Sequence, residues 1–188
     1  MKVLIGVTGS VAAVKVVELV RALRAGSIEM KMIVTERATQ CLTALDIQEL
    51  KAVIGADVYT DEAEWKLWKQ KGDPVLHIEL RRWADLFLVC PLSANTLAKM
   101  ANGICGNLLT SVVRAWDISK PIIVCPAMNT FMWDNPLTAQ HLKSISDVYK
   151  ARIVQPKAIH LLACGDTGAG ALAAIEDVVN AVLEQVIT

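Results

Sequence analysis

The sequence has few features of a disulfide-bonded, metal-binding or nucleic-acid-binding protein. Its five cysteines are an odd number with no Cys-x-x-Cys pair, which favours reduced thiols over a disulfide framework or a zinc site. Nineteen basic and nineteen acidic residues cancel, and no dense Lys/Arg tract offers a surface for nucleic acid or an anionic membrane. These absences favour a small-molecule partner and no metal.

Two further absences concern targeting. No apolar stretch reaches the roughly 18 residues that would span a bilayer. The N-terminus enters a strand pattern at once, without a cationic segment followed by a hydrophobic signal region. The sequence therefore predicts a cytoplasmic protein without a membrane partner.

What is present predicts a single α/β domain over residues 1–188, since domains commonly run roughly 100 to 200 residues. Hydrophobic residues make up 54% of the chain, which favours parallel strands covered on both faces or a large subunit interface. Short β-branched runs alternate with helical stretches, as in βαβ units on a mostly parallel sheet. The segment 57–74 lacks this pattern, and we expect it to cover one face or edge. The expected strands are 3–7, 29–35, 86–90, 121–125 and 152–154, and the expected helices include 11–25 and 175–186.

Two apolar runs stop abruptly at hydrogen-bonding side chains. The run 122–128 ends at Asn129, and the run 86–92 ends in the polar segment 93–96. Ligands of open α/β sheets bind beyond the carboxyl ends of the strands, so both polar tips are predicted to lie at one edge. Cys90 and Cys125 lie inside these runs and are predicted to be small core residues.

The loop Gly6-Val7-Thr8-Gly9-Ser10-Val11-Ala12-Ala13 follows the first expected strand. Glycines let the backbone approach a phosphate, and free N–H groups at a helix start attract an anion. The loop lacks both the Gly-Lys-Ser/Thr ending of a Walker loop and a full dinucleotide Gly-x-Gly-x-x-Gly. It therefore favours a mononucleotide phosphate, as in a flavin, with a plain strand-to-helix turn as the open alternative.

Two more side chains are candidates for chemistry. His77 lies near the start of a short expected helix, whose dipole disfavours imidazolium and suits a neutral base. Cys164 flanks the segment 165–170, where three glycines in six residues make a loop that can close over a ligand. Its thiol would then be an acid or a nucleophile. Taken singly, a histidine without a role and an incidental cysteine remain open.

Five ordered motifs together resemble the phosphopantothenoylcysteine decarboxylases, which belong to the homo-oligomeric flavin-containing cysteine decarboxylases. The resemblance runs in order from about residue 2 to about residue 180. It implies a flavodoxin-like fold, a Rossmann-type three-layer sandwich, with bound FMN and a homotrimer whose sites lie between subunits. The motifs are GVTGSVAA at 6–13, DPVLHIELRRWAD at 73–85, PLSANTL at 91–97, PAMNT at 126–130 and ACGD at 163–166.

The resemblance also implies residue roles. His77 would be the catalytic base, Asn129 would bind the substrate carboxylate, and Cys164 would donate a proton. The implied reaction is FMN-dependent decarboxylation of 4'-phospho-N-pantothenoylcysteine to 4'-phosphopantetheine in coenzyme A synthesis. It would proceed by oxidation to a thioaldehyde, loss of carbon dioxide and reduction of the enethiol. The residues implied to hold FMN are Gly9, Ser10, Val11, Ile33, Val34, Thr35, Ser93, Ala94, Asn95, Thr96, Ala127 and Met128.

The sequence departs from this family at two places and leaves other functions open. Gly106 stands where relatives often have Asp, and residues 172–174 read Leu-Ala-Ala where Met-Ala-Glu is frequent. If the acidic residue of the relatives helps to assemble the trimer, its absence here bears on the subunit interface. Alternatives are a related peptidyl-cysteine decarboxylase, a flavin prenyltransferase and a non-catalytic phosphatase-regulatory homologue. Because His77, Asn129 and Cys164 all occur on one chain, the decarboxylase is favoured.

Overall fold

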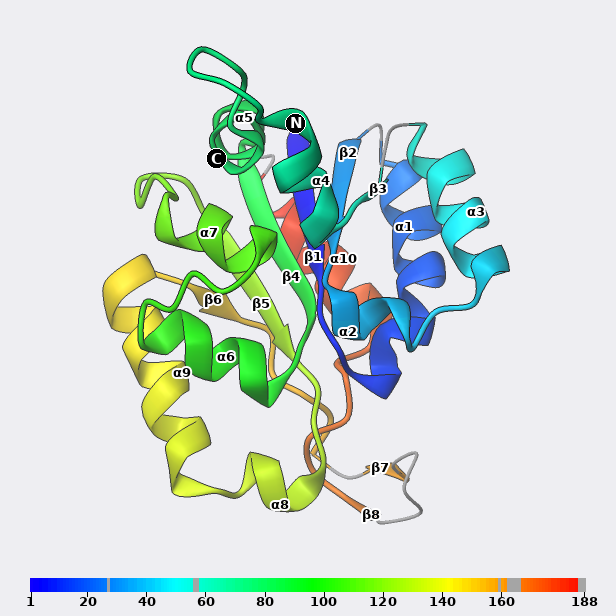
Figure 1. Ribbon diagram of the computed structural model, residues 1–188. Helices are drawn as coiled ribbons and strands as arrows, with labels where there is room; N and C mark the ends of the chain where they lie inside the picture. The colour runs from blue at the N-terminus through cyan, green and yellow to red at the C-terminus, as the bar shows by residue number, and fades with distance from the viewer. Residues whose placement is uncertain (27, 56–57, 159, 162–166, 186–188) are drawn as a thin grey trace.

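The computed structural model describes residues 1–26, 28–55, 58–158, 160–161 and 167–185 (Figure 1). Its main sheet has six strands in the order β3-β2-β1-β4-β5-β6, and every neighbouring pair is parallel. This is the doubly wound order of a Rossmann-type fold. The strands are β1 (Lys2–Val7), β2 (Glu29–Val34), β3 (Val58–Tyr59), β4 (Leu86–Leu92), β5 (Ile122–Pro126) and β6 (Arg152–Ile153).

Helices cover both faces of this sheet, which confirms the predicted three-layer α/β sandwich. One hydrophobic cluster joins the sheet to α1, α3 and α10, and a second joins it to α5, α6, α7 and α9. The 3-10 helix is η1 (Val11–Lys15), and the α-helices are α1 (Val16–Arg24), α2 (Glu36–Thr39), α3 (Ala44–Ile54), α4 (Asp61–Leu67), α5 (Leu76–Trp83), α6 (Ala94–Ala101), α7 (Leu108–Arg114), α8 (Thr130–Trp133), α9 (Pro136–Tyr149) and α10 (Ile175–Leu183).

Three details differ from the sequence-based expectations. The helix expected over 11–25 begins as η1 and becomes α-helical only in α1. The segment 57–74, which lacks a sheet pattern, contributes the short edge strand β3 as well as α4. A separate antiparallel pair, β7 (His160–Leu161) and β8 (Thr167–Gly168), was not expected.

The central strand β4 is buried on both faces, and this burial accounts for its continuous apolar sequence. Successive side chains of a strand point to opposite faces. Leu86 and Leu88 therefore pack in the cluster with α1, whereas Phe87 and Val89 pack in the cluster with α7, and all are fully buried. A strand covered on both faces has no solvated side that could carry polar residues. Polar groups are thus confined to the strand ends.

The carboxyl ends of β1 and β4 are joined by one buried hydroxyl. Thr8, which directly follows β1, donates from Oγ1 to the Pro91 carbonyl at 2.8 Å and accepts the Ser93 N–H at 2.8 Å. Because Thr8 is fully buried, this bridge satisfies backbone groups that have no access to water. It fixes the loop after β1 against the polar tip of β4.

We expect Leu88→Ala to lower the free energy of unfolding by about 2 to 5 kcal/mol, because it removes buried methyl groups and leaves a cavity between fixed strands. Leu88 is fully buried between β1 and β5, where Ile5 and Ile123 are its register partners. Leu45→Ala is the matched control, since Leu45 is 75% exposed in α3 and should cost less than about 0.5 kcal/mol. Urea unfolding checks both, and equal losses would contradict the buried position of Leu88.

Candidate functional site

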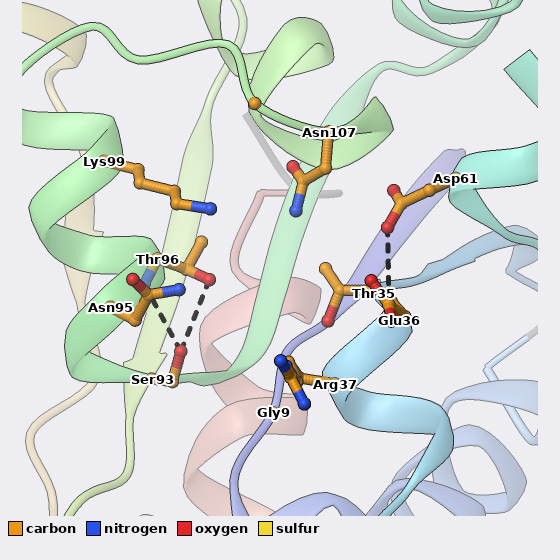
Figure 2. Close-up of a pocket in the computed structure, with 11 residues that line it drawn as sticks. Gly9, Thr35, Glu36, Arg37, Asp61, Ser93, Asn95, Thr96, Lys99 and Asn107 are labelled. Atoms are coloured by element: carbon orange, nitrogen blue, oxygen red, sulfur yellow. Dashed lines mark hydrogen bonds between the residues drawn. The ribbon is translucent and has the colours of Figure 1, made fainter.

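A cavity of about 260 Å³ lies among the carboxyl ends of β1, β2 and β4 (Figure 2). Five of the lining residues are ones that the family resemblance assigns to the cofactor, and six are not. The lining residues named as cofactor contacts are Gly9, Thr35, Ser93, Asn95 and Thr96. The lining residues not named as contacts are Glu36, Arg37, Asp61, Lys99, Gly106 and Asn107.

Four helices begin at this cavity, α2, α4, α6 and α7, and all but α4 begin with a side-chain cap. Thr35 Oγ1 accepts the Ala38 N–H at the start of α2, and Ser93 Oγ accepts the Thr96 N–H at the start of α6. Asn107 forms a capping box with Thr110 at the start of α7. Each cap satisfies one of the backbone N–H groups in the first turn of its helix. The uncapped N–H groups and the positive end of the helix dipole favour an anion in the cavity.

Two cations and two carboxylates also line the cavity, and one of the carboxylates, Asp61, is already hydrogen-bonded to two backbone N–H groups. Figure 2 shows the side chains of Arg37 and Lys99 reaching the cavity from α2 and α6. Within the described part of the chain, neither forms an ion pair. The Lys99 Nζ lies 3.6 Å from where a Cβ on Gly106 would stand. A carboxylate at position 106 would meet this ammonium, and glycine leaves it available to a bound anion.

The Gly-rich loop is packed closely against this cavity. A Cβ on Gly9 would lie 2.6 Å from Arg37 Cβ, so the backbone can pass here only as glycine. Ser10 caps η1 and also donates from Oγ to the Ala127 carbonyl at 3.1 Å. This bond ties the loop after β1 to the residue after β5. Val11 is 62% exposed at the start of η1.

The other residues named as cofactor contacts do not line this cavity. Ile33 and Val34 are fully buried in the core, so Thr35 is the member of that segment whose side chain reaches the cavity. Ala127 and Met128 are buried beyond β5, where the Met128 N–H donates to the Gly170 carbonyl at 2.9 Å. The remaining residue named there is Ala94, the half-buried first residue of α6.

Asp61 fixes the start of α4 beside the cavity. Its Oδ2 accepts the Glu36 N–H at 3.2 Å, drawn as a dashed line in Figure 2. Its Oδ1 accepts the Leu108 N–H at 3.1 Å. One carboxylate therefore links the starts of three helices, α2, α4 and α7.

His77 is the second residue of α5, as the sequence indicated, and it has a partner that the sequence did not indicate. Its Nδ1 lies 2.5 Å from Oε1 of Glu64 in α4. The two side chains are 26% and 12% exposed, so the pair is largely withdrawn from water. The two residues are 13 positions apart, and no motif of the sequence includes both, so no local pattern could reveal this contact.

A single chain does not bring the three candidate chemical residues together. Figure 1 places α5, which carries His77, and α8, which begins after Asn129, at opposite ends of the molecule. Asn129 caps α8 by accepting the Phe131 N–H at 2.9 Å. Cys164 lies outside the described residues.

The described cysteines agree with the expected reduced state. Cys90 and Cys125 are buried neighbours at the ends of β4 and β5, as predicted, and no disulfide occurs among the cysteines that the structure describes. Burial, followed by the hydrogen bond with Cys90, raises the pKa of the Cys125 thiol well above its usual range. This thiol therefore stays protonated and unreactive at neutral pH.

The described residues offer neither a metal site nor a membrane-spanning helix. They contain no cluster of three or more His, Cys, Asp or Glu side chains placed to hold a metal ion. None of the helices in this part of the chain combines the length and apolar character that crossing a membrane requires.

Comparisons with known proteins cover almost the whole chain. A family model described as Flavoprotein matches residues 1–187. Phosphopantothenoylcysteine decarboxylase from Mus musculus is 49% identical, with 98% of this chain and 88% of that protein covered. A PPC decarboxylase cysteine-to-serine mutant complexed with pantothenoylaminoethenethiol has a TM-score of 0.90 and 44% identity, covering 100% of this chain and 98% of that one. The FMN binding protein AtHal3 has a TM-score of 0.85 and 45% identity, covering 98% and 95%. These similarities and the parallel sheet confirm the predicted flavodoxin-like fold.

We expect Asp61→Asn to lower the free energy of unfolding by about 1 to 3 kcal/mol, because the amide sets an N–H donor against one of the two backbone N–H groups that Asp61 now accepts. Asp147→Asn is the control, since Asp147 forms only an exposed ion pair with Lys143, worth less than about 1 kcal/mol. Urea unfolding of both variants gives the comparison. An Asp61 variant no less stable than the control would contradict its linking role.

Proposed function

The chain belongs to the flavoprotein family, and from this premise we propose that it is an FMN-dependent carboxy-lyase that decarboxylates 4'-phospho-N-pantothenoylcysteine to 4'-phosphopantetheine. The observation that carries the proposal is the near full-length identity of 49% with a phosphopantothenoylcysteine decarboxylase. The same chain contains His77, Asn129 and Cys164, which is the set of side chains that the reaction needs. The product places the reaction in coenzyme A synthesis.

The cavity fits the phosphate end of FMN. Arg37 and Lys99 supply two positive charges, and the hydroxyls of Thr35, Ser93 and Thr96 supply hydrogen-bonding groups. The starts of three helices add N–H dipoles that favour a dianion. When bound, FMN would supply the redox chemistry by accepting a hydride from the carbon that bears the thiol and later returning it.

The protein side chains supply the rest of the reaction. A carboxylate α to an amide nitrogen leaves as carbon dioxide only if its electron pair has an acceptor. Oxidation of the substrate CH2–SH to CH=S provides one, since the carboxylate is then β to a thiocarbonyl. His77 takes the thiol proton in this step, while Asn129 holds the carboxylate. Loss of carbon dioxide leaves an enethiolate, and Cys164 donates the proton that accompanies its reduction.

The proposed active unit is a homotrimer of one-domain subunits in the cytoplasm, with sites between subunits. Helix α5, which carries His77, and helix α8, which Asn129 caps, lie at opposite ends of the molecule (Figure 1), so a second copy would have to supply one of the two residues. Exposed aromatic rings occur in α4, which packs against the helix of His77, and in α8, which follows Asn129. Trp65 in α4 is 77% exposed and Phe131 in α8 is 79% exposed, and a subunit interface would cover them.

The purified protein is expected to be yellow, with an absorption band of oxidised flavin, and to release carbon dioxide from phosphopantothenoylcysteine. Mass spectrometry of the product measures the loss, with peptides ending in cysteine as competing substrates. A protein that stays colourless after reconstitution with FMN would refute the cofactor. Turnover of the peptides alone would instead indicate a peptidyl-cysteine decarboxylase.

Cys164→Ser is expected to bind FMN and to release carbon dioxide but to stall before the final reduction, because serine is a far weaker proton donor than a thiol. The oxidised enethiol should accumulate, which mass spectrometry detects. Cys105→Ser, at an exposed cysteine, is the control and should turn over normally. Normal turnover by Cys164→Ser would remove the proton-donor role.

A further inference from the structure

We propose that Glu64 is the positioning residue for His77: it holds the imidazole so that Nε2 is presented to the substrate thiol. The proposal rests on the function given above, in which His77 is the base. Glu64 acts through His77 and does not itself contact substrate.

The contact between the two side chains fixes the tautomer of the imidazole. Glu64 Oε1 lies 2.5 Å from His77 Nδ1, and an ionised carboxylate can only accept a hydrogen bond. Nδ1 therefore carries the proton of the neutral ring, and the lone pair lies on Nε2. A base that takes a thiol proton needs this free lone pair.

The burial of Glu64 indicates that the pairing is specific. The side chain is only 12% exposed, and its Oε2 is buried without a hydrogen-bond partner in the described structure. Burying a carboxylate without a partner is costly, so the His77 contact is the main compensation available to it. Glu62, two residues earlier on the same helix, instead forms an exposed ion pair with Lys66.

The position of Glu64 depends on the fold around α4. Asp61 anchors the first residue of this helix to the Glu36 and Leu108 N–H groups. Glu64 follows three residues later, within one helical turn. Since α4 also packs against α5, the carboxylate is held in front of the second residue of that helix. The helix that borders the cavity at Asp61 thus carries the group that orients the base.

The carboxylate also stabilises the charge that proton transfer creates. When the substrate S–H bond breaks and an Nε2–H bond forms, the imidazole becomes a cation, while the electron pair of the S–H bond stays on sulfur. Glu64 keeps its charge and faces this cation through the Nδ1 contact, in a site largely withdrawn from water. The proton ends on His77 and does not pass to Glu64.

The test compares Glu64→Gln with Glu62→Gln, the same change two residues apart on α4. Glutamine keeps the shape of the side chain but removes its charge. We expect Glu64→Gln to lower kcat about 10- to 100-fold, part of the roughly 10²- to 10⁴-fold effect of a positioned base, with KM and FMN content unchanged. Glu62→Gln should match the wild type. Equal kcat values for the two variants would overturn the role of Glu64.

A double-mutant cycle separates positioning from a general loss of structure. In a His77→Asn background, Glu64→Gln should change the residual turnover by less than about 2-fold, because its effect passes through the imidazole. A full additional loss in this background would mean that Glu64 supports the fold and would overturn the proposal. A wild-type protein that binds FMN but never decarboxylates phosphopantothenoylcysteine would refute the proposed function itself.

Discussion

The constraint on which this structure depends is the burial of the central strands on both faces. Helices cover each side of β1, β4 and β5, so these strands carry apolar side chains everywhere except at Lys2, the exposed first residue of β1. The core formed by the described residues therefore contains no polar side chains that could act on a substrate. Hydrogen-bonding groups can lie only where the strands end. Because all six strands are parallel, their carboxyl ends share one edge, and the cavity forms there. The location of the site follows from how the core is packed.

The side chains that cap three helices stabilise the fold at the border of the proposed cofactor cavity. Thr35, Ser93 and Asn107 cap the helices that follow, which any sequence folding this way requires in some form. The caps place helix dipoles at the cavity, and Arg37 and Lys99 then add full charges. An anion in the cavity would therefore further stabilise the N-termini of α2, α6 and α7, which are already capped without it.

Patterns within short stretches of sequence predict the sheet and the helix layers, and the family resemblance adds five of the eleven residues that line the cavity. The strand ends at Ser93 and Asn129 are visible because an apolar run stops there. Arg37 and Glu64 are not visible in this way, because their positions follow from the packing of α2 and α4, and no motif links Glu64 to His77. The family resemblance also assigns Ile33 to the cofactor, and the side chain of this residue is fully buried in β2.

Helix α4 connects the parts of the molecule that sequence patterns left separate. Asp61 borders the cavity at the start of the helix, Glu64 contacts His77 from the buried side, and Trp65 is exposed on the outer side. Such a short helix contributes little stability of its own, so its position depends on the Asp61 hydrogen bonds and on packing against α5 and α7. A subunit that covered Trp65 would contact α4, the helix whose Glu64 is proposed to orient His77. In the proposed homotrimer, assembly and the geometry of the base would therefore be mechanically coupled through α4.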